Sequence, residues 1–385
     1  MYLINGILHT MAAPIIPQGY VCFDGGKITA TGAMAELSLP ANAEVLDVAG
    51  CHIYPGLVDA HTHLGVFGDS LGFEGEDGNE ITDPVTPQLR AIDAINPFDR
   101  CFQEAREGGI TCVVTGPGSA NPIAGQLVAI KTAGRRVDDM IVKAPVAMKF
   151  ALGENPKSCY NDRHETPTTR MATTALIREE LFKAKEYLIK KERATADEDC
   201  DEPDFDLKLE ALLPVVKGDL PAHFHAHRAD DIATAVRIAK EFNLQYVVLH
   251  CTEGHLIADL LAEDHVQVVT GPIFGDRSKP ELSNQRLDNT AILKKAGVKV
   301  AICTDHPENP EQYLPMAAAL CAKNGVDPEE AMAAVTCDAA SIAGIADRVG
   351  TLEVGKDADI AVFRGSPLEL NATVEAVFID GCRVK

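Results

Sequence analysis

The chain has 385 residues, 46% of them hydrophobic and 24% charged, which is typical of a globular enzyme with a sizeable core. Its 57 aspartates and glutamates outnumber its 35 lysines and arginines, so the formal net charge is -22 at pH 7. Nucleic acids and anionic membranes bind basic surfaces, and we therefore expect neither as a partner.

The cysteines and the first residues indicate the compartment. The 11 cysteines are scattered without a CxxC pair, and the chain does not open with a basic segment followed by a long apolar run. No apolar run reaches the roughly 20 residues that a membrane helix requires. We expect buried, reduced thiols and a cytoplasmic protein.

Short strand-like segments occur at both ends of the chain, and two of them flank the turn Asp24-Gly25-Gly26. They cover residues 20–23, 27–30, 359–363 and 374–381. Strands this short need partners to be stable. We therefore predict that residues 1–54 and 350–385 together form one small β-sandwich domain, with residues 55–349 inserted between them as a larger domain.

The larger domain alternates apolar strand-like runs with helical segments, the pattern of an α/β fold with a parallel sheet. A long helix is predicted to begin at Thr168 or Thr169 and to lead into an acidic, solvated connector at 194–206. The candidate strands are 57–61, 110–115, 127–131, 144–150, 220–226, 246–250, 266–270 and 298–304. Eight such strands predict a (β/α)8 TIM barrel.

The first of these strands runs into the pair His61 and His63. Side chains alternate faces along a strand, so residues spaced i, i+2 point the same way. Two imidazoles on one face form half of a site for a divalent metal. Taken alone, the pair is equally compatible with two histidines on a polar strand face.

Other potential metal ligands also lie where apolar strand runs stop. They are Lys149, His225, His250 and Asp305. Catalytic residues of barrels come from the carboxyl ends of strands and the loops that follow. A single histidine at a strand end is more often a hydrogen-bonded structural residue, but ligand types at five separate strand ends are hard to obtain by chance. The pattern predicts a metal centre at one end of the barrel.

These residues belong to longer segments that resemble the amidohydrolase superfamily, in particular its imidazolonepropionase-like and dipeptidase-like branch. The resemblance covers nearly the whole chain and is specific for the superfamily but not for one substrate. The matching segments are PGLVDAHTH at 55–63, MKFALGENPK at 148–157, HAHRADDI at 225–232, LHCTEGH at 249–255, CTDHP at 303–307 and VGTLEVGKDADIAVF at 349–363.

The resemblance implies a role for each of these residues. His61 and His63 would bind the more buried metal, and His225 and His250 the outer one. Asp305 would ligate a metal and transfer protons as the catalytic acid and base. The metals implied are zinc ions, two per chain, although another divalent metal fits the same ligands.

Lys149 matches the position where several relatives carry a lysine carboxylated by carbon dioxide, whose two oxygens bridge a pair of metals. A lysine in an apolar run is desolvated, so its neutral amine becomes accessible and can attack carbon dioxide. The alternative is a lysine whose stem lies along the barrel rim and whose ammonium reaches water.

The histidines at 223, 225 and 227 would share one face if their strand continued. The family pattern favours His225 as the ligand. His223 would then lie one layer deeper, and His227 would belong to a loop near the substrate. For both we expect a structural or supporting role.

These implications together predict a metal-dependent hydrolase that cleaves a C–N amide bond of a small molecule by metal-activated water. The substrate classes are a cyclic amide, an N-acyl amino acid or a dipeptide-like compound. One alternative is a mononuclear imidazolonepropionase- or deaminase-type hydrolase, although here Ala226, His227 and Arg228 follow His225 in place of the His-x-x-Glu of deaminases. Another is a catalytically inactive barrel scaffold, but such relatives usually lose several ligands.

Substrate specificity is expected to reside in the loops after the strands. Arg228 and Arg277 could each clamp a substrate carboxylate, or merely pair with a nearby acid. The remaining candidates for substrate contact are Asn155, Gln126 and His227. A small molecule is the expected partner, and homo-oligomers are common among such folds.

Overall fold

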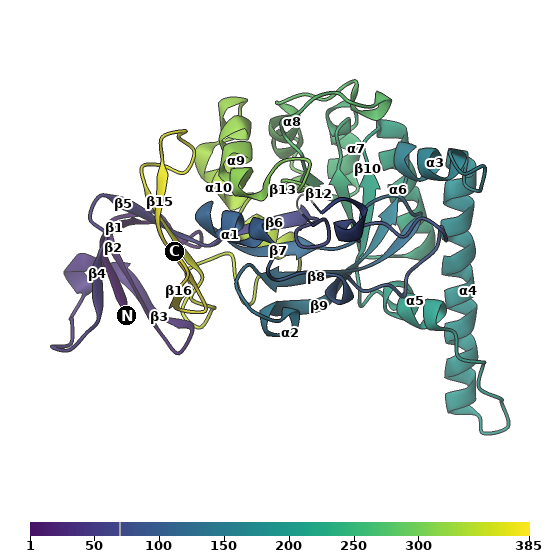
Figure 1. The fold of residues 1–385 in the computed structure, drawn as a ribbon, viewed down its shortest axis with the longest axis horizontal. Coiled ribbons are helices and arrows are strands. Elements are labelled where there is room, and N and C mark those ends of the chain that lie inside the picture. Colours follow the sequence, from purple (N-terminus) through teal and green to yellow (C-terminus); the bar gives the residue numbers. More distant parts are fainter. Residues whose placement is uncertain (69–70) are drawn as a thin grey trace.

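The structure is a computed structural model that describes residues 1–68 and 71–385. Figure 1 shows a small β unit at one side, in which the first and last segments of the chain lie together, and a larger barrel with helices at the other. Within the described residues, no helix has both the length and the apolar character needed to cross a membrane.

The small β unit is built from both ends of the chain. Its strands are β1 (Tyr2–Leu8), β2 (Ile16–Asp24), β3 (Lys27–Ala33), β4 (Val45–Asp47), β5 (Cys51–Pro55), β14 (Ile360–Arg364), β15 (Thr373–Ile379) and β16 (Cys382–Arg383). The order is β16-β15-β14-β5-β1-β2-β3, with β4 paired to β1. The two ends meet where β5 and β14 pair antiparallel, from Ile360 opposite Pro55 to Arg364 opposite Cys51. Because hydrogen bonds join all of these strands in one sheet, the predicted two-sheet sandwich is not confirmed.

The second sheet is a nearly closed barrel, and each of its strands overlaps one of the eight segments predicted from the sequence. They are β6 (Leu57–Thr62), β7 (Ile110–Thr115), β8 (Ile123–Lys131), β9 (Ile141–Ala151), β10 (Ala222–Ala226), β11 (Tyr246–His250), β12 (Gln267–Thr270) and β13 (Lys299–Ile302). Their spatial order follows the chain. The first and last strands meet just beyond β13, where the Asp305 amide donates to the His61 carbonyl at 3.2 Å.

One strand departs from a regular (β/α)8 barrel. β8 pairs antiparallel with both β7 and β9, whereas the other neighbouring strands of the barrel pair in parallel. A parallel crossover needs a dozen or more residues. The connections at 116–122 and 132–140 are shorter than that, so β8 has to reverse direction on both sides.

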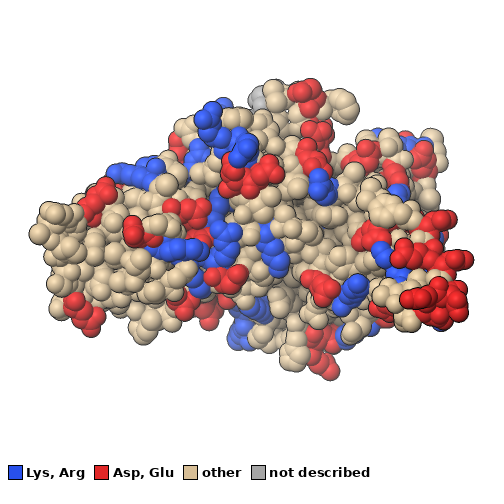
Figure 2. Space-filling model, turned by 90° about the horizontal axis from the view of Figure 1, so that it is seen from below, with Lys and Arg blue, Asp and Glu red and all other residues tan. Residues whose placement is uncertain are grey.

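Helices cover the outside of the barrel. They are α1 (Arg100–Glu107), α2 (Val137–Met140), α3 (Glu154–Asn161), α4 (Arg170–Ala196), α5 (Leu207–Lys217), α6 (Ala229–Phe242), α7 (Ala258–Glu263), α8 (Asn289–Lys295), α9 (Leu314–Lys323), α10 (Pro328–Ala333) and α11 (Cys337–Ile342). The hydroxyl of Thr169 accepts from the Ala172 amide at 3.1 Å and caps the long helix α4. The acidic connector that follows α4 is solvated as predicted, and Figure 2 shows acidic side chains gathered at that end of the molecule.

Candidate metal centre

The barrel brings the six predicted ligands to one end. His61 lies in β6, Lys149 in β9, His225 in β10 and His250 at the last position of β11. The two others, His63 and Asp305, lie just beyond β6 and β13. All six side chains are buried.

The first cluster consists of His61, His63 and Asp305, whose ligand atoms lie within 4.8 Å of one another. The Asp305 Oδ1 oxygen is 3.3 Å from His63 Nε2 and 3.5 Å from His61 Nε2. This oxygen is buried and has no hydrogen-bond partner among the described residues. A buried carboxylate oxygen left in this way between two imidazoles is suited to binding a cation.

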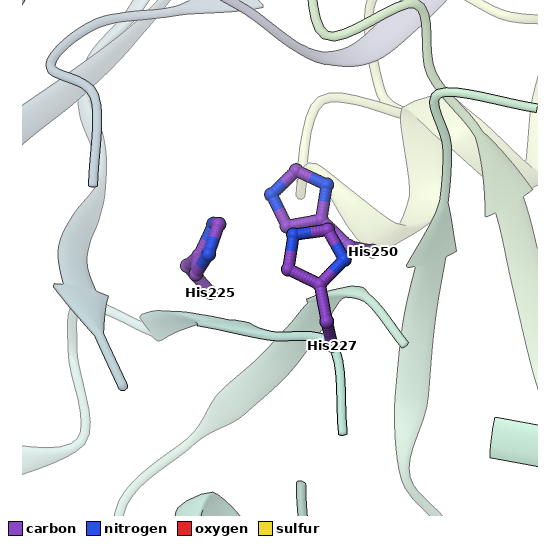
Figure 3. Close-up of side chains that lie close together, drawn as sticks. All are labelled: His225, His227 and His250. Atoms are coloured by element: carbon purple, nitrogen blue, oxygen red, sulfur yellow. The ribbon is translucent and has the colours of Figure 1, made fainter. Parts of the chain in front are cut away.

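The second cluster consists of His225, His227 and His250, whose ligand atoms also lie within 4.8 Å of one another. The rings of His227 and His250 are stacked, with centroids 4.6 Å apart. Figure 3 shows the His225 ring edge-on beside this stack. The centroid of His225 is 4.7 Å from that of His227 and 4.5 Å from that of His250.

Hydrogen bonds fix the tautomers of two of these histidines. His63 Nδ1 lies 2.7 Å from the carbonyl oxygen of Gly116, and His250 Nδ1 lies 2.7 Å from that of Gly271. A carbonyl oxygen can only accept, so in each ring Nδ1 carries the proton and Nε2 keeps its lone pair. This is the usual arrangement in histidines that bind a metal through Nε2.

Burial keeps these imidazoles in the neutral form that binds metals. It lowers the pKa of His61 and His225 well below the ordinary value. It also lowers the pKa of His250 to about 4, although Asp305 opposes the shift. For Asp305 burial acts in the opposite sense, but His250 and His63 outweigh it and hold the pKa of this carboxyl below its usual range. The arrangement therefore combines neutral nitrogen donors with an ionised carboxylate and fits a divalent metal.

Lys149 lies directly beside the first cluster. Its side chain is fully buried, and its Nζ is 3.0 Å from His61 Nε2. Burial lowers the pKa of this amine to about 8, although Asp305 acts in the opposite direction. The neutral amine is therefore far more accessible than in an exposed lysine, as a reaction with carbon dioxide requires.

The backbone is strained at two of the predicted ligands. His250 has a φ of 68° and Asp305 a φ of 56°, in the left-handed region that favours glycine. Such residues cost about 1–3 kcal/mol each and gather at functional sites. The chain tolerates this strain at the ends of β11 and β13, where the side chains turn into the barrel mouth.

Comparison with known proteins agrees with this geometry. Residues 52–384 match the model of the Amidohydrolase family. The chain belongs to this family. An amidohydrolase from Thermotoga maritima MSB8 has a crystal structure that superposes with a TM-score of 0.96 at 40% identity, covering 100% of this chain and 99% of the other.

The present chain is also similar in sequence to two hydrolases. It is 29% identical to the amidohydrolase tasK of Hapsidospora irregularis, over 94% of this chain but only 39% of that protein, so it spans well under half of tasK. It is 26% identical to the imidazolonepropionase of Pseudomonas putida, over 91% of this chain and 88% of that enzyme. The family and these relatives make the chain a hydrolase.

A layer of buried carboxyl groups lies behind the first cluster of this amidohydrolase and was not predicted from the sequence. Asp59 accepts hydrogen bonds from the His61 amide at 3.0 Å and from the Thr304 hydroxyl at 2.6 Å. Glu311 accepts from the Thr62 hydroxyl at 2.8 Å, and its Oε2 lies 3.2 Å from the Thr304 hydroxyl oxygen. These bonds join β6 to the segment after β13 and so hold the backbone beside His61 and Asp305. The sequence signal was an acid, Asp59, two residues before His61 in the same predicted strand.

The histidines flanking His225 have different positions. His223 is buried on β10, in register with Lys149 on β9, and belongs to neither cluster. His227 lies one residue beyond β10 and joins the second cluster. A supporting role was expected for His227, but its imidazole lies with those of His225 and His250 in the second cluster.

The predicted substrate-binding residues differ in their surroundings. Asn155 lies at the site, with Nδ2 3.3 Å from His225 Nε2. Gln126 lies on β8 and donates to the Pro87 carbonyl at 3.4 Å. The two arginines are engaged elsewhere: Arg228 forms a two-pronged pair with Asp230 at 2.9 Å, and Arg277 donates to the Gln285 carbonyl at 2.8 Å. Both guanidinium groups are solvent-accessible and have local partners, and the pair of Arg228 with Asp230 matches the second of the two alternatives given for the arginines.

Lys279 and Glu281 were also missed. Both belong to the long connection after β12, where no motif marks them. Glu281 is buried, and its Oε1 lies 3.0 Å from the Lys279 ammonium. Burial would raise the pKa of Glu281, but His227 and Lys279 lower it below the usual value. The connection therefore supplies an ionised carboxylate to the second cluster.

Proposed function

We propose that the protein is a metal-dependent amidohydrolase that cleaves the C–N amide bond of a small cyclic amide, N-acyl amino acid or dipeptide-like molecule. The observation that carries this proposal is the pair of buried clusters at one end of the barrel, each with three ligand atoms within 4.8 Å. Two adjoining clusters favour two ions over the single ion of the mononuclear alternative.

The chemistry follows from the residues present. His61, His63 and Asp305 would hold one ion, and His225 and His250 the other. A bound zinc ion lowers the pKa of its water from about 15.7 to about 7 and polarises a carbonyl oxygen. The Asp305 carboxylate, ionised and close to both clusters, would accept a proton from the attacking water and deliver it to the departing nitrogen.

Removing the metal is expected to abolish activity. A panel of imidazolones, hydantoins, N-acyl amino acids and dipeptides identifies the substrate with zinc-loaded protein. Exhaustive chelation should then eliminate turnover, and zinc should restore it, because water that is not bound to a metal has a pKa of about 15.7 and is hardly deprotonated at neutral pH. Full turnover by a protein shown to be metal-free would contradict the proposal, as would a failure of the protein to bind metal at all.

The resemblance to imidazolonepropionases of 24% to 26% identity supports a cyclic amide as the first substrate to test. The number of metal ions per chain distinguishes a mononuclear from a binuclear enzyme. One equivalent per chain in an active imidazolonepropionase would favour the mononuclear enzyme, and two equivalents would favour the binuclear one. Intact clusters argue against an inactive scaffold, because such a protein has no need of them.

We further propose that Lys149 is carboxylated, in which case its carbamate would supply oxygen ligands to the two ions. After incubation with ¹³C-bicarbonate, the zinc-loaded protein should show one carbamate carbonyl resonance by NMR, and Lys149→Met should abolish it. The matched control is Lys240→Met, which removes an exposed lysine paired with Asp264 and should leave the resonance in place. No carbamate signal in the loaded wild type would leave Lys149 as a buried amine beside His61.

A further inference from the structure

Glu281 approaches the second cluster closely enough to bind the same ion. It lies in the short helix η5 (Pro280–Leu282), and its side chain is completely buried. Its Oε1 is 3.7 Å from His227 Nε2 and 3.8 Å from His225 Nε2. Two ligands of one tetrahedral zinc ion are about 3.3 Å apart when the bonds are about 2.0–2.1 Å long. The contraction required is therefore only a few tenths of an ångström.

The other Glu281 oxygen fixes the side chain in this orientation. Oε2 accepts from the Glu154 amide at 3.1 Å, and Glu154 in turn accepts from the Glu281 amide at 3.1 Å. This reciprocal pair ties the connection after β12 to the start of α3. With one oxygen held, the other is directed at His225 and His227.

His227 is held equally well. Its Nδ1 lies 2.7 Å from the Thr252 hydroxyl, in the segment after β11. Its ring stacks on that of His250, with an angle of 13° between the planes. A hydroxyl can accept from Nδ1, which leaves the lone pair on Nε2, the atom that faces Glu281. The ring is thus oriented as a ligand by a neighbour outside the cluster.

The balance of charges at the second cluster is also compatible with a bound cation. The three imidazoles of the second cluster lie beside the buried Glu281 carboxylate, and the Lys279 ammonium is the neighbouring positive charge. Lys279 is shared, because it also donates to the Asn155 carbonyl oxygen at 2.9 Å. A buried carboxylate facing two imidazole nitrogens is a set of donors that a divalent ion satisfies.

We propose that His227 and Glu281 are ligands of the outer metal, together with His225 and His250. This inference rests on the proposed metal dependence and extends it. The outer ion is then held by four side chains of the protein whether or not Lys149 carries a carbamate. Binding also fixes the connection after β12 over the barrel mouth.

The test is a titration of the metal-free protein with Co²⁺, followed by visible absorption and by metal content after dialysis. Glu281→Gln keeps an oxygen for the Glu154 amide but loses the anionic ligand. His227→Asn keeps a donor for Thr252 but loses Nε2. Each variant should bind one of the two ions with an affinity reduced by more than about 100-fold, because loss of a residue that only supports a ligand reduces metal affinity by about 10- to 100-fold. Each should also change the absorption bands of that ion, while Lys149→Met should retain the outer ion.

The matched control is Glu241→Gln, the same chemical change in a residue of α6 that pairs with Arg178 and does not face the imidazoles. It should bind both ions like the wild type. X-ray absorption of the zinc-loaded wild type gives an answer that needs no variant: five imidazoles shared by two ions if His227 binds, and four if it does not.

Four imidazoles by X-ray absorption, or wild-type affinity and spectra in both Glu281→Gln and His227→Asn, would overturn the inference and leave the proposed function intact. A wild type that binds no metal would overturn both.

Discussion

An Asp305→Asn variant is expected to lose about 10²- to 10⁴-fold in kcat, the usual contribution of a positioned acid and base. The Asp305 carboxylate lies in the first cluster and near the second: Oδ1 is 3.3 Å from His63 Nε2, and Oδ2 is 3.9 Å from His250 Nδ1. An amide at this position cannot accept a proton at neutral pH. Steady-state kinetics on the identified substrate, with metal content measured in parallel, separates the loss of proton transfer from the loss of an ion.

Asp230→Asn is the matched control. Asp230 lies on the same side of the barrel, is largely exposed and pairs with Arg228 rather than with a histidine of the clusters. Its kcat should remain at the wild-type value. If the Asp305→Asn protein binds both ions and its kcat is within a few fold of the wild-type value, then Asp305 does not transfer the proton.

The strands of the barrel could be found from the sequence because their apolar runs are a direct consequence of burial on both faces. Direction could not be read from such a run, and β8 was expected to be parallel like its neighbours. The information lay in the lengths of the adjoining connections, 116–122 and 132–140, which are too short for parallel crossovers. The pairing of the chain ends followed from the same reasoning about short strands, whereas their arrangement in one sheet is a property of the packed structure.

The site likewise contains residues that could be predicted from the sequence and residues that could not. His61, His225 and His250 end regular strands, so the topology of a barrel brings them together without further information. Glu281 lies in an irregular connection, and its position depends on hydrogen bonds to Glu154, which no local pattern records. For Arg228 the sequence allowed a substrate carboxylate or a nearby acid as partner, and the guanidinium contacts Asp230, two residues away. Sequence indicates which residue types reach the barrel mouth, and tertiary contacts decide which of them face it.

The reversed direction of β8 has a further consequence, because it places the end of this strand at the opposite end of the barrel from the metal clusters. Lys131, the last residue of β8, is opposite Cys112, near the start of β7. Its buried Nζ lies 2.9 Å from Asp357 and 2.8 Å from Asp359, in the segment that leads into β14. Asp357 also pairs with Lys27 of β3. This buried charge cluster joins the barrel to the small sheet.

Lys131→Met should lower the free energy of unfolding by about 3–5 kcal/mol, because it leaves the buried Asp359 carboxylate without its cation, whereas Asp357 keeps Lys27 and Arg348. Urea unfolding measures the loss. The matched control, Lys240→Met, removes an exposed ion pair with Asp264 and should cost at most about 1 kcal/mol. Equal unfolding free energies for wild type and Lys131→Met would show that the cluster does not stabilise the junction.

The loss in Lys131→Met should also depend on pH, and the sign follows from the carboxyl groups left behind. Burial raises the pKa of Asp359 above its ordinary value even with Lys131 in place, and removing the ammonium raises it further. A folded-state pKa above the unfolded one means that the folded variant binds the proton more tightly. Its stability is therefore highest below the unfolded pKa and falls as the pH rises through the folded pKa. The difference in unfolding free energy from the wild type should be larger at about pH 8 than at about pH 5, and a difference that shrinks with rising pH would mean that these carboxyl groups are not the cause.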